Sequence, residues 1–199
     1  MKGLLIAFEG LDQSGKQTQA ELLRDRFVGQ GRDVKLLSFP DYDTPIGAEI
    51  ASALRGDRHY APDLMQLLYV ANRYEWRDRI VADRSQGTIL VCDRYLASSV
   101  AYGEAHGLDA IWLASIQKYL PQPDVTVLLD ISPEVSARRK QRDRDRYERD
   151  LALLARVRDS YLRQARSQGW VRLDADRDRT VVAADVYAAV AQSLEVDAN

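Results

Sequence analysis

The sequence feature that most restricts the fold is a glycine-containing loop, which lies between a short apolar run and a helical pattern. Within the stretch EGLDQSGKQTQ, the residues Gly10, Gly15 and Lys16 match the pattern G-x-x-x-x-G-K. The apolar run of residues 4–8 precedes this match, and residues 16–30 repeat apolar side chains at helical spacing. Glycines let successive backbone N–H groups point at a phosphate, and the helix N-terminus adds a favourable dipole. The context therefore predicts a phosphate-binding loop, and a plain glycine turn is the weaker interpretation.

This loop would bind the phosphates of a nucleotide through backbone amides and one side-chain charge. We expect Lys16 to reach the β- and γ-phosphates as a point charge. Gln17 occupies the position where a hydroxyl would normally ligate Mg²⁺, and its amide oxygen is an acceptable ligand for the ion or for one of its waters. Thr18 comes one position too late for that role. The predicted nucleotide-binding residues of this stretch are Gly10, Leu11, Asp12, Gln13, Ser14, Gly15, Lys16, Gln17 and Thr18.

Short apolar runs alternate with longer helical patterns along the chain, and this alternation predicts the architecture. The runs are continuous, as expected for strands whose two faces are both covered. They occupy residues 4–8, 34–39, 88–92, 125–129 and, as a shorter fifth run, 171–173. Helical patterns cover residues 16–30, from Pro62 to near Gly87, 109–119, 133–140, 149–168 and 180–194. We therefore expect an α/β fold of three layers, with a parallel five-stranded sheet, helices on both faces, and one domain over residues 1–199.

Composition excludes several classes of function. With 28 basic and 30 acidic residues the net charge is −2, so the chain lacks the basic field of a nucleic-acid-binding protein. The apolar run of residues 4–8 is too short for a signal-peptide core or a membrane span. Cys92 is the single cysteine and lies in an apolar run, which predicts a buried thiol. We expect a soluble cytoplasmic protein without a nucleic-acid or membrane partner.

A second group of polar residues follows the third predicted strand. The stretch CDRYLASSVAYG places Asp93 and Arg94 at the carboxyl end of this strand, where open α/β sheets bind ligands. Asp93 could hold Mg²⁺ through water, and Arg94 offers a planar fork for a second phosphate. The alternative for Arg94 is a salt bridge at a strand end. The tetrapeptide N-K-x-D of guanine-nucleotide switches does not occur in the sequence, which disfavours that class.

Six short motifs follow one another along the chain: FEGLDQSGKQTQ, FPDYDTPIG, LLYVANRYEW, DRYLASSVAY, the RYE of DRDRYERD and a late LDA. Together they resemble the thymidylate (dTMP) kinase family of P-loop nucleoside monophosphate kinases over essentially the whole chain. The resemblance implies a P-loop NTPase fold of the nucleoside monophosphate kinase type with a small lid over about residues 137–150. It also implies transfer of the γ-phosphoryl group of ATP to dTMP in the presence of Mg²⁺, giving ADP and dTDP for dTTP synthesis, and a homodimer.

The resemblance places the acceptor site on the helix that begins at Pro62 and on the segment after Arg94. Tyr69 would stack on thymine, and Arg73, four residues later on the same helix face, would donate to the O4 atom of the base. Tyr102 would crowd the 2′ carbon of the sugar and favour deoxynucleotides. The implied dTMP-binding residues are Glu9, Asp12, Phe39, Pro40, Tyr42, Tyr69, Arg73, Arg94, Ser98, Ser99, Tyr102 and Tyr147.

The same resemblance implies that catalytic arginines come from the lid. Gln13 stands where one branch of the family has a loop arginine, whereas residues 137–150, ARRKQRDRDRYERD, are rich in arginine. These arginines would neutralise the transferring phosphoryl group, and a solvated helix face with Asp–Arg pairs is the alternative. Arg139 would stack on adenine, and Ala175 would border it. The implied catalytic residues are Lys16, Arg94, Asp12, Arg142, Arg144 and Arg146.

Two other functions remain open from the sequence. The chain could phosphorylate a different (deoxy)nucleoside monophosphate, or it could be a nucleotide-binding module without turnover, for which Gln17 would be the sign. Rates with dTMP, dUMP, dCMP, UMP and AMP would separate the first alternative from dTMP phosphorylation. His59 and His106 have no role in the proposed chemistry, and we expect both at the surface.

Overall fold

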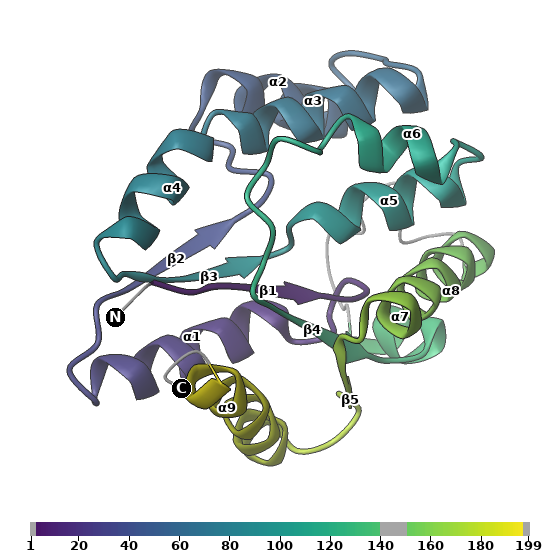
Figure 1. Cartoon of the computed structure of the whole chain (residues 1–199). Coiled ribbons are helices and arrows are strands. Elements are labelled where there is room, and N and C mark those ends of the chain that lie inside the picture. Colours follow the sequence, from purple (N-terminus) through teal and green to yellow (C-terminus); the bar gives the residue numbers. More distant parts are fainter. Residues whose placement is uncertain (1–2, 140–150, 197–199) are drawn as a thin grey trace.

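The central sheet confirms the predicted architecture. The computed structural model describes residues 3–139 and 151–196 of the chain. Within these residues, one parallel sheet has the strand order β2-β3-β1-β4-β5 (Figure 1). Its strands are β1 (Leu5–Glu9), β2 (Val34–Ser38), β3 (Ile89–Asp93), β4 (Val125–Asp130) and β5 (Val171–Asp174). Each strand lies within one residue of a predicted apolar run at both ends, so the continuous runs identified the strands correctly.

Helices cover both faces of this sheet. On one face, α1 (Lys16–Val28) packs against α9 (Arg179–Val196) (Figure 1). On the other face lie α4 (Arg77–Ser85), α5 (Leu96–Ala105), α7 (Pro133–Arg139) and α8 (Leu151–Gln168), and α5 packs along α8. An outer row beside α5 contains α2 (Pro45–Arg55), α3 (Pro62–Tyr74) and α6 (Ala110–Ser115). The three predicted layers are therefore present, with a further row of helices packed outside α5.

Burial along the strands explains why the apolar runs are continuous. The middle strands β1 and β4 are buried at every position, and β3 is buried up to its last residue. The outer strands β2 and β5 are only partly buried. Cys92 of β3 is buried, as predicted from its apolar surroundings. A strand covered on both faces needs apolar side chains in both directions, which removes the alternation seen in half-exposed strands.

The helix predicted from Pro62 to near Gly87 is two helices in the structure. The chain breaks between α3 and α4 at Glu75 and Trp76. The indole Nε1 of Trp76 donates a hydrogen bond to Asp41 Oδ2 at 2.9 Å, so the break anchors the loop that follows β2. Apolar residues keep helical spacing across the break, which is why the pattern indicated one continuous helix.

Two helices, α2 and α5, were not predicted. Buried residues of α5 surround its axis, so the helix has no apolar stripe opposite a polar face. The start of α2 does have a local sequence signal, which is a threonine followed by a proline. Thr44 is its N-cap, with a hydroxyl that accepts from the Gly47 N–H at 3.0 Å, and Pro45 occupies the first helical turn.

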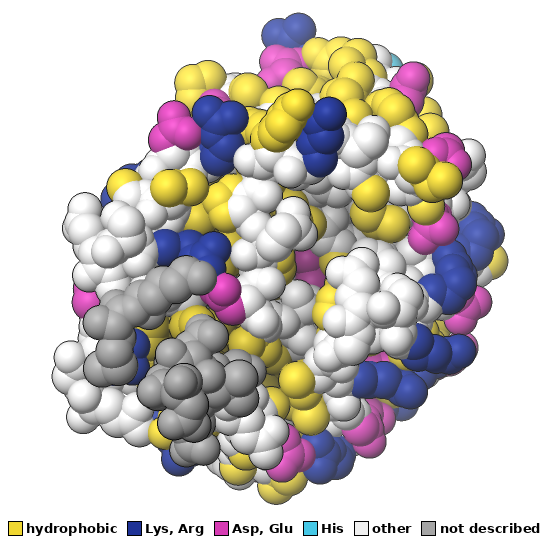
Figure 2. Space-filling model, in the orientation of Figure 1, with side chains coloured by type: hydrophobic (Ala, Val, Ile, Leu, Met, Phe, Trp, Pro, Cys, Tyr) yellow, Lys and Arg dark blue, Asp and Glu magenta, His cyan; other side chains and the backbone are white. Residues whose placement is uncertain are grey.

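The surface shows no strong field of one sign on the face in view. Figure 2 shows basic and acidic side chains interspersed, with hydrophobic side chains gathered at the top over α2 and α3. In the described ranges, no helix combines the length and the apolar character needed to cross a bilayer.

The loop between β2 and α2 is fixed to α3 by one buried side chain. Asn72 is 0% exposed, and its Oδ1 accepts from the Asp41 N–H at 2.8 Å. Its Nδ2 donates to the Asp41 carbonyl at 3.0 Å and to the Thr44 hydroxyl at 2.7 Å. Gly47 lets α2 approach the same loop, because a Cβ there would lie 1.7 Å from the Asp41 carbonyl oxygen. The loop is therefore held from two sides.

We expect Gly47→Ala to destabilise the protein, although glycine-to-alanine changes inside helices normally stabilise by up to about 1 kcal/mol. The new methyl group would overlap the Asp41 carbonyl, so α2 must move away from the loop. This overpacking should lower the free energy of unfolding by about 1–3 kcal/mol. Urea unfolding measures the change, and Ala48→Gly, at the exposed next position, controls for helix propensity. A higher free energy of unfolding in Gly47→Ala would contradict the close contact.

Candidate active site

The loop between β1 and α1 has the backbone conformation that its glycines allow. Gly10 has a φ of 141°, and a Cβ at this position would lie 2.4 Å from the Leu129 carbonyl oxygen. Gly15, with a φ of 91°, is the N-cap of α1 and turns the chain into the helix. L-residues rarely adopt such φ values. The loop therefore leads into the N-terminus of α1, where backbone amides and the helix dipole favour an anion.

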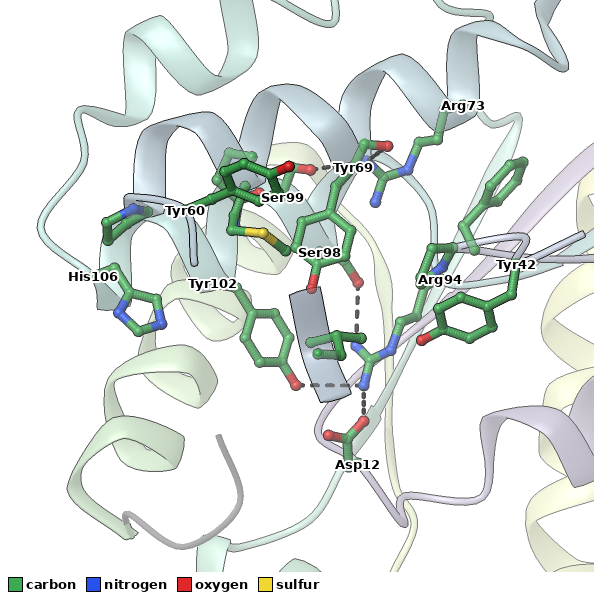
Figure 3. Close-up of a pocket in the computed structure, with 16 residues that line it drawn as sticks. Asp12, Tyr42, Tyr60, Tyr69, Arg73, Arg94, Ser98, Ser99, Tyr102 and His106 are labelled. Carbon is green, nitrogen blue, oxygen red and sulfur yellow. Dashed lines mark hydrogen bonds and ion pairs between the residues drawn. The ribbon is translucent and has the colours of Figure 1, made fainter. Parts of the chain in front are cut away.

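Two neighbouring cavities meet at the carboxyl ends of β1 and β3. The first, which we call the loop cavity, has a volume of about 370 Å³ and is bordered by Lys16 and its neighbours. The second, the α3–α5 cavity, has a volume of about 330 Å³ and lies between those helices (Figure 3). The residues that border both cavities are Asp12, Phe39, Pro40, Tyr42 and Arg94. Two ligands bound in these cavities would meet at this shared wall.

Most of the predicted phosphate-binding stretch borders the loop cavity. The bordering residues from this stretch are Asp12, Gln13, Gly15, Lys16, Gln17 and Thr18. Leu11 and Ser14 are buried, and Gly10 contributes its carbonyl oxygen to Arg94. The predicted nucleotide contacts therefore fall into a group that faces the cavity and a group that supports the loop.

Lys16 is a buried cation beside the loop cavity. Its Nζ donates to the Leu11 carbonyl oxygen at 2.9 Å. Burial, and then the charge of Arg94, lower the pKa of Lys16 to about 8, although carboxylates such as Asp93 act in the opposite direction. A bound phosphate would add negative charge and favour the protonated amine.

Arg94 connects the two cavities. Its backbone has a left-handed φ of 63°. One terminal nitrogen of its guanidinium donates to the Gly10 carbonyl oxygen and to the hydroxyls of Ser98 and Tyr161, each at 3.2 Å. The other terminal nitrogen pairs with the Asp12 carboxylate. This planar fork is therefore fixed at the point where the cavities meet (Figure 3).

The charge of Arg94 is maintained by its neighbours. Burial alone would lower the pKa of this guanidinium, but Tyr102, Asp12 and Tyr161 raise it well above its ordinary value. The Tyr102 hydroxyl accepts a long hydrogen bond of 3.4 Å from Arg94, and the guanidinium carbon lies 5.3 Å from the centre of the Tyr102 ring. Arg94 is thus a permanent cation between the cavities.

Glu9 lies behind the wall of the α3–α5 cavity. Its carboxylate accepts from the Tyr95 N–H at 2.8 Å, from the Ser98 hydroxyl at 2.7 Å and from the Tyr161 hydroxyl at 3.1 Å. Glu9 does not border this cavity among the described residues, so the structure does not place it where we predicted a contact with dTMP. Burial and then Glu9 raise the pKa of the Tyr161 phenol well above its ordinary value, so Tyr161 is neutral. Glu9 is therefore placed to orient Ser98 and Tyr161.

The predicted base-binding residues of α3 and α5 come together in the α3–α5 cavity. Tyr69, Arg73, Ser98, Ser99 and Tyr102 all border it. Arg73 is 3% exposed, and its guanidinium donates to the Ser99 hydroxyl at 2.8 Å and to the Tyr69 carbonyl at 3.2 Å. Burial lowers the pKa of Arg73. In the described residues its Nε has no hydrogen-bond partner, so it keeps a donor in reserve.

The donor side of the site includes Arg139 of α7. One of its terminal nitrogens donates to the Gln13 carbonyl at 3.3 Å, and the other donates to the Ala175 carbonyl at 3.1 Å and to Asp176. The loop after β1 therefore lies beside the loop after β5, as an adenine site would require. The remaining predicted lid residues, Arg142, Arg144, Arg146 and Tyr147, lie outside the described residues.

The donor set beside the loop cavity fits a magnesium ion. Asp93 and Gln17 both border this cavity. Among the described residues, the buried Oδ1 of Asp93 has no hydrogen-bond partner, and Gln17 uses its amide nitrogen to donate to Glu21 at 3.0 Å. Residues 3–139 and 151–192 contain no cluster of three or more His, Cys, Asp or Glu that could hold a metal by itself. Few protein ligands are the usual arrangement for Mg²⁺, which keeps waters and binds substrate phosphates.

Three residues of the site were not predicted in these roles. Tyr161 supports Arg94, and Asn72 fixes the loop after β2. His106 was expected at the surface, but it is half-buried and borders the α3–α5 cavity, whereas His59 is exposed as expected. Asn72 lies inside the motif LLYVANRYEW, but no local pattern indicates the role of any of the three, because each acts through contacts across the fold.

Comparisons with known proteins point to one family. The family model described as thymidylate kinase matches residues 8–186. The thymidylate kinase of Schizosaccharomyces pombe is 38% identical over 148 residues, which cover 74% of this chain and 70% of that protein. The thymidylate kinase of Dictyostelium discoideum is 36% identical over 177 residues, covering 88% and 79%. A solved structure of the thymidylate kinase of Candida albicans has a TM-score of 0.82 at 29% identity, covering 96% of this chain and 92% of that one.

Nucleotide binding should take up a proton through Lys16. Because the pKa of Lys16 is about 8, part of the population has a neutral amine at about pH 8.5. A bound triphosphate would favour protonation of this amine. We expect ATP to bind more weakly as the pH rises above about 8, and the proton uptake to disappear below about pH 7, where Lys16 is already charged. Calorimetry in two buffers with different ionisation enthalpies measures the uptake.

The matched variant for this experiment is Lys16→Arg, because a guanidinium stays charged over the whole range. It should bind ATP without taking up a proton near pH 8.5. Equal proton uptake by the wild type and this variant would show that another group titrates.

Proposed function

Because this chain belongs to the thymidylate kinase family, it is a phosphotransferase that acts on dTMP, and we propose that its phosphoryl donor is ATP. The reaction moves the γ-phosphoryl group of ATP to dTMP and gives ADP and dTDP, a step towards dTTP. The observation that carries the proposal is the meeting of the two cavities at Arg94 and Asp12. A triphosphate in the loop cavity and a nucleotide in the α3–α5 cavity would bring their phosphates together there.

The acceptor needs positioning but no general base. The phosphate of a nucleoside monophosphate is largely dianionic at about pH 7, so its oxygen can attack directly. The Arg94 fork, held by Gly10, Ser98 and Tyr161, would keep that oxygen in line with the γ-phosphorus. Asp12 would face the region of the acceptor's 3′-hydroxyl.

Charge on the transferring group would be neutralised from several sides. Lys16 and the backbone amides of the loop would contact the donor phosphates, while Arg139 and Ala175 would border adenine. We assign the lid contribution to Arg142, Arg144 and Arg146, with Tyr147 near the acceptor's sugar. A lid that closes over both nucleotides would exclude water and limit hydrolysis of ATP.

Mg²⁺ would be held beside the loop cavity by Asp93 and Gln17, with the remaining positions filled by waters and donor phosphates. When bound, the ion would supply positive charge to the β- and γ-phosphate oxygens. The amide of Gln17 is neutral, so the charge on the protein side comes from Asp93.

The α3–α5 cavity supports thymine and deoxyribose as the acceptor's parts. Tyr69 would stack on the base, and the donors of Arg73 suit the O4 acceptor of thymine. The amino group of cytosine would face these donors and leave the buried guanidinium unpaired. Tyr102 would crowd a ribose hydroxyl. Ser98 and Ser99 complete the wall, although their hydroxyls are engaged by Glu9 and Arg73.

With ATP and Mg²⁺, dTMP should have the highest kcat/KM among dTMP, dUMP, dCMP, UMP and AMP. We expect dUMP to follow, because one methyl group is worth only about 1–3 kcal/mol of discrimination. A coupled assay for ADP and chromatography of dTDP measure the reaction. A preference for AMP or dCMP would assign the chain to another acceptor, and binding without dTDP formation would indicate a non-catalytic module.

Two arginine variants provide a matched control for this assay. The side chains of Arg94 and Arg84 are each 15% exposed, and each pairs with one aspartate, but Arg84 pairs with Asp124, outside both cavities. Arg94→Lys keeps the charge and loses the fork, so kcat/KM for dTMP should fall by about 10²-fold or more. Arg84→Lys should leave kcat/KM nearly unchanged. Equal losses in both variants would mean that Arg94 acts only through stability.

We also propose that the protein acts as a cytoplasmic homodimer, with α3 and α6 as the interface. α3 exposes Leu64 and Leu67 at 42% and 43%, and α6 exposes Ile111 at 80%. Both helices lie at the top of Figure 1 and both pack on α5. The Tyr74 hydroxyl at the end of α3 donates to the carbonyl of Ile116, the C-cap of α6, at 3.1 Å. The net charge of −2 opposes self-association only weakly. A single buried cysteine suits a reducing compartment.

Leu67→Arg should convert the dimer into monomers, because it places a charge among the exposed apolar side chains of the proposed interface. Sedimentation equilibrium measures the mass. Val181→Arg, on the exposed side of α9, is the control and should stay dimeric. A monomeric wild-type protein at assay concentrations would remove this part of the proposal.

A further inference from the structure

Gln66 of α3 is a buried polar residue that neither the motifs nor the proposed mechanism uses. It is 3% exposed and borders the α3–α5 cavity. In the part of the chain that the structure describes, its Oε1 atom has no hydrogen-bond partner. Buried amide oxygens are nearly always paired, because an unpaired one loses its hydration without compensation. A ligand atom in the cavity would complete this group.

We propose that Gln66 is a further base-binding residue whose Oε1 accepts the N3–H of the acceptor's pyrimidine base. The inference rests on the proposed function and identifies the residue that binds the N3–H group of the base. Gln66, Tyr69 and Arg73 are spaced i, i+3 and i+7, so they share one face of α3, and all three border the same cavity.

The order along α3 puts Gln66 on the far side of Tyr69 from Arg73. Figure 3 shows Tyr69 near the middle of the cavity, with Tyr60 and His106 at the end away from Arg94. Gln66 lies about one helical turn before Tyr69, towards the start of α3. A base stacked on Tyr69 with its O4 at Arg73 can therefore turn the rest of its edge towards Gln66.

The chemistry of the base edge requires an acceptor that Arg73 cannot provide. Thymine presents an acceptor at O4, a donor at N3 and an acceptor at O2, whereas a guanidinium only donates. The Ser99 hydroxyl oxygen already accepts from Arg73 at 2.8 Å, and the Ser98 hydroxyl is engaged by Glu9 at 2.7 Å. Gln66 Oε1 is a buried acceptor at this cavity whose hydrogen-bonding capacity is unused among the described residues.

Gln66 and Arg73 would have different roles in binding the base. A carboxamide can rotate and offer its NH₂ group to the N3 lone pair of cytosine, so the rejection of cytosine rests on Arg73. Gln66 instead strengthens the binding of every base with an N3–H. Loss of its amide should therefore weaken dTMP and dUMP to a similar extent.

The test changes the side chain and the base atom separately. The dissociation constants of dTMP and N3-methyl-dTMP are measured by calorimetry with the wild type and with Gln66→Met, which has a similar length and no amide. Methylation removes the N3–H and adds a steric cost. We call the ratio of the two dissociation constants, that of N3-methyl-dTMP over that of dTMP, the methylation factor. It should be about tenfold larger for the wild type than for Gln66→Met, because only the wild type loses a hydrogen bond. Equal factors in both proteins overturn the proposal.

Two further variants control for shape and for general loss of a buried glutamine. Gln66→Glu keeps the size and an acceptor oxygen, so the methylation factor should stay close to that of the wild type. A factor like that of Gln66→Met would overturn the proposal. Gln117→Met removes another buried glutamine whose Oε1 has no partner among the described residues, but which lies outside the α3–α5 cavity. Its methylation factor should equal that of the wild type.

The outcomes distinguish this inference from the proposed function. If the wild type forms no dTDP, the proposed function fails whatever the binding data are. If it forms dTDP but the methylation factors are equal, only the role of Gln66 fails. Should Gln66→Met not fold, a methylation factor below about tenfold in the wild type itself would overturn the role.

Discussion

The site depends on one constraint, which is that the Arg94 guanidinium must stay charged and fixed where little water reaches it. A buried charge is tolerated only where hydrogen bonds and opposite charge replace hydration. The Gly10 carbonyl, the Tyr161 hydroxyl and the Asp12 carboxylate provide these partners. They come from the loop after β1 and from α8, so one side chain joins segments 67 to 84 residues apart. The Glu9 carboxylate accepts a hydrogen bond from the Tyr161 hydroxyl and so helps to position this partner of Arg94.

Lys16 and Arg94 are two nearby cations that repel each other. The charge of Arg94 adds to burial in lowering the pKa of Lys16. Anionic phosphates relieve this repulsion, so the site favours states with negative charge between the two side chains. In the proposed reaction, such fixed charges would stabilise the transferring phosphoryl group without reorganising. Rigid support by the loop after β2, which Asn72 fixes, keeps both cavities aligned along their shared wall.

Local patterns predicted much of the fold because strands and regular helices leave periodic signals. The strands were found within a residue, since burial on both faces imposes continuous apolar runs. α5 was missed because it is buried around its axis, and α3 was extended through α4 because apolar spacing continues across Trp76. Residues within motifs, such as Tyr69 and Arg73, were brought together as expected, and their contacts with dTMP stay a prediction.

The sequence by itself determined the glycine loop before α1, the positions of the strands and the residue types at the strand ends, because these depend on near neighbours along the chain. Only the tertiary structure decided that Glu9 lies behind the wall of the α3–α5 cavity and that Tyr161 accepts a hydrogen bond from Arg94. It also decided that Gln66 borders this cavity with an Oε1 atom that has no hydrogen-bond partner among the described residues. Burial, hydrogen-bond partners and pKa values depend on atoms that approach through space, and no local pattern specifies which distant residues those will be.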